Sequence, residues 1–188
     1  MSVKTFSTEV LTSADTNTYL TNSGLVYVTS ASATSGTSLS INNCFTSTYS
    51  NYRIVISNLV TTGAAAIYFR LRASSADATA ADYYYNGFYF ATYASTTISG
   101  YAGSAITYFD TSTVGDTLAS GAIIEVLQPQ VASRTQFGCH GFDPRSSTGS
   151  GGRYASGMHN TNNQYDGFTI YNCTFTSVTA TVYGYRKA

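Results

Sequence analysis

The sequence predicts an all-β protein built as an antiparallel β-sandwich, and three observations carry that prediction. The chain contains 17 Tyr and 10 Phe, and its polar residues are mostly Ser, Thr and Asn, types that favour pleated strands and turns. Short apolar or alternating segments follow one another with turn residues between them, at a spacing typical of a sandwich or a barrel. No helix of crossover length separates consecutive strands, so a parallel sheet is not expected.

The expected strands lie after residue 24. Residues 67–72 give the clearest case, because apolar and polar side chains alternate there with a period of two. Residues 122–127 are nearly all apolar, which indicates a central strand. Asn86-Gly87 interrupts an aromatic segment and predicts either a hairpin tip or a bulge. The expected strands are 25–29, 37–41, 52–57, 67–72, 83–93, 104–109, 122–127, 134–142, 154–159, 167–171 and 178–185.

The start of the chain differs from the rest. Ser13 suits the N-cap of a helix, and Asp15 follows in the first turn, where a carboxylate interacts favourably with the helix dipole. We therefore expect one short helix from Ala14 to Leu20. Residues 1–24 would form an anchoring arm, and residues 25–188 the β-sandwich domain.

Charge is scarce and balanced. Charged residues make up 10% of the 188 residues, and 9 Lys and Arg offset 9 Asp and Glu, whereas about a quarter of a typical chain is charged. This composition lacks the excess of Lys and Arg that nucleic-acid binding requires. A net charge near zero also favours association between protein copies. No apolar stretch reaches the roughly 18 residues of a membrane span, and neither membrane insertion nor a signal peptide is expected.

The three cysteines do not predict a metal site or a disulfide framework. Cys44, Cys139 and Cys173 are odd in number and widely spaced. We favour buried free thiols, with one disulfide plus a free thiol as the alternative. His140 next to Cys139 could form half of a metal or nucleophile site, but no partner residues have matching spacing.

Catalysis is not expected either. Asp77 with Asp82, and Asp110 with Asp116, are the candidate carboxylate pairs for glycosidase chemistry. All four lie beside Ser, Thr, Ala or Gly, where aspartate commonly caps turns. The sequence therefore predicts no enzyme, no cofactor and no metal.

Binding is the better prediction. The aromatic segment from Tyr83 to Tyr93 offers Tyr84, Tyr89 and Tyr93 as candidate contact residues, because tyrosine gives a large contact area with few rotatable bonds. A strand has two faces, so alternate members of this segment could instead fill the core. A second candidate patch lies on a polar sheet face and consists of Tyr68, Arg70 and Arg72.

Three phrases resemble virion proteins of tailed bacteriophages. LTSADTNTYL at residues 11–20 is similar to an N-terminal motif of tail-fibre and other virion structural proteins, roughly L-T-x-x-D-x-N-x-Y-L. CFTSTYSNYRIVIS at 44–57 and TVYGYR at 181–186 look like segments of small virion proteins of marine tailed phages. The candidate anchoring residues in the first motif are Leu11, Asp15, Asn17, Tyr19 and Leu20.

The resemblance implies a jelly-roll-like β-sandwich on the outside of a virion, made in the host cytoplasm, often a homotrimer and held by its N-terminal arm. Its partners would be other virion proteins and a host surface glycan or protein receptor. The chain is short and lacks a fibre shaft, which argues against a full-length fibre and keeps a head-decoration or tail-tip role open. A tail-fibre or receptor-binding module leads, with a capsid decoration protein as an alternative. A free carbohydrate-binding β-sandwich module is a further alternative.

Overall fold

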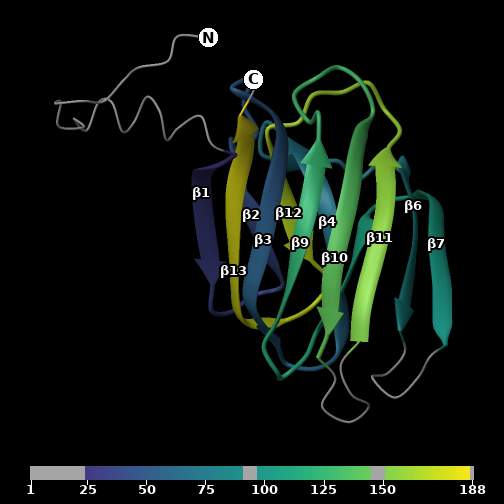
Figure 1. The fold of residues 1–188 in the computed structure, drawn as a ribbon. Helices are drawn as coiled ribbons and strands as arrows, with labels where there is room; N and C mark the ends of the chain where they lie inside the picture. Colours follow the sequence, from purple (N-terminus) through teal and green to yellow (C-terminus); the bar gives the residue numbers. More distant parts are fainter. Residues whose placement is uncertain (1–23, 91–96, 145–150, 187–188) are drawn as a thin grey trace, which may run out of the picture.

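The computed structural model describes residues 24–90, 97–144 and 151–186, and it confirms the all-β prediction (Figure 1). The described residues form strands and no helix. The expected helix at 14–20 lies outside them. The strands are β1 (Leu25–Ala33), β2 (Ser38–Ile41), β3 (Tyr49–Thr61), β4 (Ala65–Ala73), β5 (Ala76–Asp77), β6 (Tyr83–Phe90), β7 (Ile98–Ile106), β8 (Phe109–Gly115), β9 (Ser120–Leu127), β10 (Thr135–Asp143), β11 (Gly151–His159), β12 (Gly167–Tyr171) and β13 (Phe175–Arg186).

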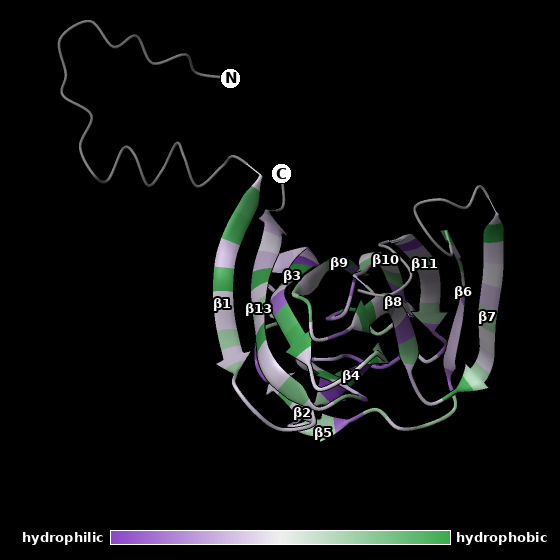
Figure 2. Cartoon of the chain, turned by 90° about the horizontal axis from the view of Figure 1, so that it is seen from below, coloured by the Kyte–Doolittle hydropathy of each residue, from purple (hydrophilic) through white to green (hydrophobic). Residues whose placement is uncertain are grey.

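The strands form two antiparallel sheets in a sandwich-like arrangement. The larger sheet has 8 strands in the order β1-β13-β3-β9-β10-β11-β6-β7. The smaller sheet has 5 strands, ordered β2-β12-β4-β5, with β8 also pairing β4. Seen from below, the larger sheet forms one layer with β1 and β7 at its two flanks, and β2, β4 and β5 lie in the other layer (Figure 2).

Strands distant in the sequence pair in a nested order. β1 pairs β13, β2 pairs β12, β3 pairs β9 and β4 pairs β8, each pair antiparallel. The remaining strands β10, β11, β6 and β7 extend the larger sheet beyond β9. The chain therefore folds like a long hairpin whose paired halves alternate between the two layers.

An aromatic core joins the layers. Phe69 and Phe109 come from the smaller sheet and Phe137 from the larger, with ring centroids 5.5 Å apart for Phe69–Phe137 and 5.0 Å for Phe109–Phe137. Phe168 stacks on Phe69 at 5.4 Å. All four side chains are buried. Burial of such rings stabilises each by roughly 1.5–3 kcal/mol relative to exposure, so this cluster fixes how the sheets face each other.

The period-two predictions are confirmed. The apolar sets that alternate in three expected strands are all buried: Tyr52, Ile54 and Ile56; Ile67, Phe69 and Leu71; Val178, Ala180 and Val182. Residues 122–127 belong to β9, which lies within the larger sheet as expected. Cys44, Cys139 and Cys173 are buried free thiols, as favoured over a disulfide.

Two local predictions are wrong. The expected strand at 104–109 straddles a turn, because β7 ends at Ile106 in the larger sheet and β8 begins at Phe109 in the smaller one. Asn86-Gly87 forms neither a hairpin tip nor a bulge, since both residues pair in register with β11 and with β7. Gly87 is needed there for close packing: an added Cβ would lie 2.4 Å from the Tyr154 carbonyl oxygen and 2.6 Å from the Tyr101 ring.

None of the described segments forms a helix with the length and apolar character that a membrane crossing needs.

Candidate binding face

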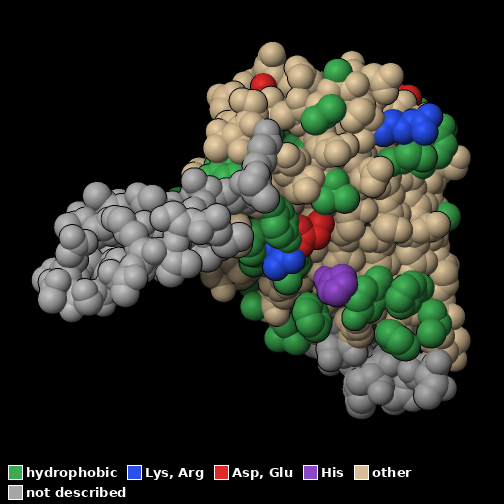
Figure 3. Space-filling view, turned by 45° about the horizontal axis from the view of Figure 1, so that its top comes forward, with side chains coloured by type: hydrophobic (Ala, Val, Ile, Leu, Met, Phe, Trp, Pro, Cys, Tyr) green, Lys and Arg blue, Asp and Glu red, His purple; other side chains and the backbone are tan. Residues whose placement is uncertain are grey.

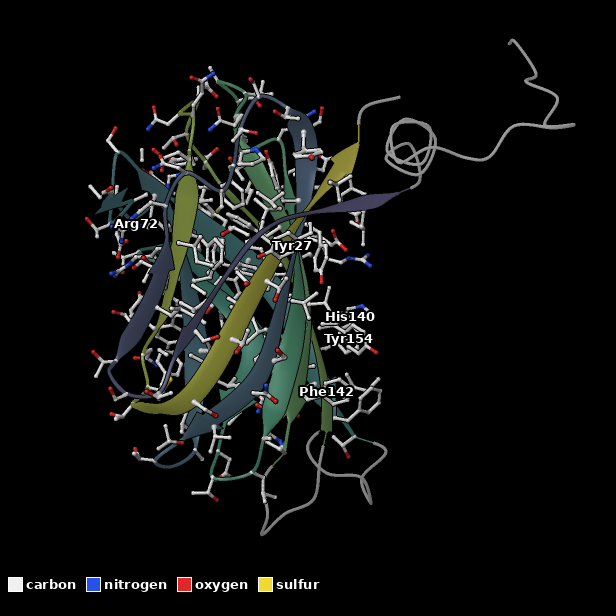
Figure 4. The ribbon with its side chains drawn as sticks, turned by 90° about the vertical axis from the view of Figure 1, so that its left-hand side faces the viewer. Tyr27, Arg72, His140, Phe142 and Tyr154 are labelled. Carbon is white, nitrogen blue, oxygen red and sulfur yellow. The ribbon has the colours of Figure 1, made fainter. Side chains whose placement is uncertain are left out.

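Arg72, a candidate predicted from the sequence, and several exposed aromatic side chains lie on opposite sides of the molecule. In the side view of Figure 4, Arg72 projects from one face, while Tyr27, His140, Phe142 and Tyr154 project from the other. The first face belongs to the smaller sheet and the second to the larger sheet. Tyr93 and the five candidate anchoring residues lie outside the described residues.

On the smaller sheet, the arginines are engaged within the protein. Arg72 forms an ion pair with Asp77, and its guanidinium donates to Asn42 Oδ1 at 2.8 Å and Thr169 Oγ1 at 2.8 Å. Arg70 Nε donates to the Thr107 carbonyl oxygen at 2.8 Å. These contacts hold both guanidinium groups against neighbouring residues, and most donors of Arg72 are already used within the protein.

The tyrosines of this face are also engaged with one another. Tyr68 stacks on Tyr108 with ring centroids 3.8 Å apart, and Tyr171 meets Tyr68 edge-on at 5.8 Å. The Arg70 guanidinium lies over the Tyr171 ring at 4.4 Å. Burial, followed by the hydrogen bond to Tyr108, raises the pKa of Tyr68 to about 12. Tyr68, Arg70 and Arg72 therefore form part of a packed surface network.

The aromatic segment in β6 is divided between two faces. Tyr89 points into the sandwich, where Arg153 lies over its ring at 4.6 Å and Tyr101 packs at 6.2 Å. Tyr84 lies on the outer face of the larger sheet and pairs with Met158 of β11. The structure thus separates two of the predicted contact residues and leaves only Tyr84 on an open surface.

Among the residues that the structure describes, the outer face of the larger sheet carries most of the exposed aromatic side chains. Phe142 is 61% exposed and Tyr154 37%. Phe88 stacks on Tyr154 at 5.1 Å, and His140 meets Tyr154 edge-on at 4.5 Å. Figure 3 shows hydrophobic side chains gathered around a histidine on this face, close to one acidic and one basic side chain. Exposed apolar clusters of this kind mark interaction sites.

The register sorts this face into rows that cross the strands. One row runs through Ile123, His140, Tyr154 and Phe88, which are direct partners on β9, β10, β11 and β6. A parallel row on the same face, four residues away along each strand, runs through Leu127, Gln136, Met158 and Tyr84. Both rows contain large side chains, and they stand as walls on either side of a lower row.

The lower row forms the floor of what we call the trough, defined by Glu125, Gly138, Ser156 and Asn86. These four residues are direct partners on β9, β10, β11 and β6. Two open hollows of about 950 and 430 Å³ each include all four of them. A Cβ added to Gly138 would have its nearest neighbour at 4.0 Å, the Cβ of Glu125. The missing side chain of Gly138 therefore keeps the middle of the floor low.

An ion pair closes one end of the trough. Arg53 Nε donates to Glu125 Oε1 at 2.6 Å, and the Tyr185 hydroxyl lies 2.9 Å from each Glu125 oxygen. The hydrogen bond to Glu125 raises the pKa of Arg53 above its ordinary value. Burial, and then the hydrogen bond to Glu125, raises the pKa of Tyr185. The two opposite charges neutralise each other.

Several groups that could take part in chemistry are buried or bonded within the protein. His159 is buried, and its Nδ1 lies 2.9 Å from the hydroxyls of Thr161 and Tyr165; burial lowers its pKa. Burial also raises the pKa of the Cys139 thiol. Asp77 binds Arg72 and Thr169. Among the described residues, no group of three or more His, Cys, Asp or Glu could hold a metal ion.

Sequence reasoning missed His140, Phe142, Tyr154 and Gly138 as a surface. A usable signal was present in residues 136–142, where Gln136, Gly138, His140 and Phe142 alternate with buried or small residues. That alternation places them on one outer face of a strand.

Searches against protein-family models, curated proteins and solved structures gave no match for this chain.

Proposed function

We propose that this chain is a non-catalytic attachment module on the exterior of a tailed-phage virion, closest in type to a tail-fibre or receptor-binding module. Residues 1–24 hold it to the particle, and the outer face of the larger sheet is directed away from the particle. Three virion-like phrases of the sequence support the particle assignment. The observation that carries the attachment role is the exposed aromatic face around Tyr154 and Phe142.

We further propose that the domain is a jelly roll. The nested pairing of β1 with β13, β2 with β12, β3 with β9 and β4 with β8 supports this, because rolling one long hairpin of eight strands into two layers gives such an order. Jelly rolls are common in viral capsid and lectin domains. A fold alone does not determine function, so the contact face is the stronger argument.

A homotrimer is part of the proposal. The balanced charge leaves little electrostatic repulsion between copies. Light scattering at two protein concentrations tests it, with a stable trimer expected and a monomer at both concentrations counting against it.

The particle role is tested with purified virions of the phage that encodes the chain. We expect the protein to be present on intact particles, and antibodies against the folded domain to label the outside and block adsorption to host cells. Substituting Tyr19→Ala and Leu20→Ala in the full chain is expected to abolish incorporation without changing the thermal unfolding temperature. Labelling without any block of adsorption would instead favour a capsid decoration role.

A further inference from the structure

We infer that the trough binds an uncharged oligosaccharide. This inference rests on the proposed attachment function and assigns it a ligand class and a place. It follows from four properties of the trough: its shape, its hydrogen-bonding groups, its charge balance and its aromatic walls.

The shape of the trough fits a ligand that enters it better than it fits the same face of a second copy of the chain. The floor at Gly138 and Ser156 is low, and walls of large side chains rise on both sides. A two-fold contact would place one such hollow against another and leave a void, whereas stable interfaces pack as densely as protein interiors. The trough also crosses the strands, so its occupant does not extend the sheet by pairing with an edge.

The polar groups of the trough require a partner that both donates and accepts hydrogen bonds. Gln136 offers an amide on one wall, and His140 and Tyr154 offer a ring nitrogen and a hydroxyl on the other. Within the described parts of the chain, these three side chains make no hydrogen bond with the protein. On the floor, the Ser156 hydroxyl lies 3.2 Å from Asn86 Oδ1, which leaves further capacity on both. Covering such groups with an apolar surface would cost roughly 1–3 kcal/mol each.

The charge balance favours a neutral ligand. Arg53 and Glu125 pair with each other at 2.5 Å, and Tyr185 donates to the same carboxylate. A sulfated or carboxylated chain would have to compete for Arg53 and would meet Glu125 at once. An uncharged, hydroxyl-rich chain leaves that pair intact and finds amides, hydroxyls and an imidazole along the trough.

The aromatic walls supply the remaining contact. Phe88 and Tyr154 stack with an interplanar angle of 20°, and His140 stands edge-on to Tyr154, so the three rings hold one another in place. Pyranose rings present C–H groups on one face and hydroxyls at the rim. The aromatic wall can pack against the C–H face of the sugar, and the polar floor can bond its hydroxyl groups. Other ligand sites likewise combine apolar walls with a few polar groups.

The test uses the full-length protein and an array of neutral glucans, mannans, galactans and xylans beside sulfated and uronic-acid glycans. Gly138→Leu fills the trough, and the nearest neighbour of its Cβ lies at ordinary contact distance. Gly100→Leu is the matched control, because its Cβ would also have only one neighbour, at 3.8 Å, and Gly100 lines neither hollow of the trough. Gln136→Met removes the wall amide at nearly constant volume.

We expect binding to at least one neutral glycan, with affinity at least tenfold weaker in Gly138→Leu, weaker in Gln136→Met and unchanged in Gly100→Leu. Unfolding temperatures of the variants are expected to be no lower than that of the wild type, because replacing a strand glycine removes its conformational cost. Silence of the neutral glycans, preference for the charged ones, or binding unaffected by Gly138→Leu would overturn the inference. So would a change of oligomeric mass in Gly138→Leu, because it would identify the face as a contact between copies.

Failure of this inference is distinguishable from failure of the proposed function. A protein that is found on virions and whose antibodies block adsorption, but that binds no neutral glycan, keeps its attachment role and loses the ligand assigned here. A protein that binds a neutral glycan through the trough but is absent from particles keeps the site and loses the virion role.

Discussion

Two glycines on neighbouring strands are predicted to respond in opposite ways to the same substitution. Gly138 lies on β10 and faces outward, where a Cβ would have 4.0 Å of room. Gly157 lies on β11 and pairs with Phe137. A Cβ added to Gly157 would lie 2.3 Å from the Tyr84 carbonyl oxygen and 2.7 Å from the Cβ of Tyr85. Comparing the two Ala variants therefore tests whether the floor of the trough is open.

The expected sizes follow from these distances. Glycine within a strand costs roughly 0.5–1 kcal/mol relative to alanine, so Gly138→Ala is expected to stabilise the fold by up to about that amount. Gly157→Ala forces β11 away from the backbone of β6, and overpacking of this kind costs roughly 1–3 kcal/mol. The two variants are therefore expected to differ by about 1.5–4 kcal/mol in free energy of unfolding.

The assay is equilibrium unfolding in urea, with the slope m compared between the variants to confirm that only stability changes. Equal stabilities for the two variants would contradict the packing described for β6, β10 and β11. A loss of more than about 1 kcal/mol in Gly138→Ala would mean that the floor is filled in solution, and it would remove the structural basis of the trough.

Three further predictions concern the core and its titratable groups. Phe137→Ala is expected to lower the unfolding free energy by roughly 3–5 kcal/mol in the same assay, because Phe137 is buried against rings of the other sheet; a loss under about 1 kcal/mol would contradict the two-layer core. Burial lowers the pKa of His159 below its ordinary 6.5. As the pH falls, the unfolded chain therefore takes up a proton at this histidine before the folded chain does. The free energy of unfolding is expected to decrease as the pH drops below 6.5. Urea midpoints at pH 7.5 and 5.5 measure this, and His159→Phe is expected to reduce the difference. Burial raises the pKa of Cys44 and Cys173 to about 12, so a thiol reagent at pH 8 is expected to label neither thiol until urea unfolds the chain; rapid labelling of the native protein would contradict their burial.

The strands with one buried face can be predicted from the sequence, because alternation with a period of two identifies the side chains that are buried. Residues 67–72 and 178–182 show this alternation, and their apolar members are buried. The strands β7 and β8 are harder to predict from the sequence. β7 is an edge strand rich in Gly and Ala, and β8 buries Thr111 and Thr113, so neither has the apolar pattern that marks a strand.

The contact face could be predicted only in part, for a topological reason. Its rows combine residues from β9, β10, β11 and β6, and β6 ends at Phe90, well before β9 begins at Ser120. Alternation identifies the outer residues of one strand, but only the register brings Tyr154 beside both His140 and Phe88. Tyr84 could be selected as a candidate from composition, whereas its partners across the sheet could not.

The most direct test of the attachment role is hydroxyl-radical footprinting of Phe142 and Tyr154, in the free protein and on the intact virion. An outward-directed contact face predicts equal labelling of both rings in the two samples, with loss of labelling only when the particle binds host cells. Protection of both rings on the isolated particle would contradict the account, because the face would then be buried against the virion.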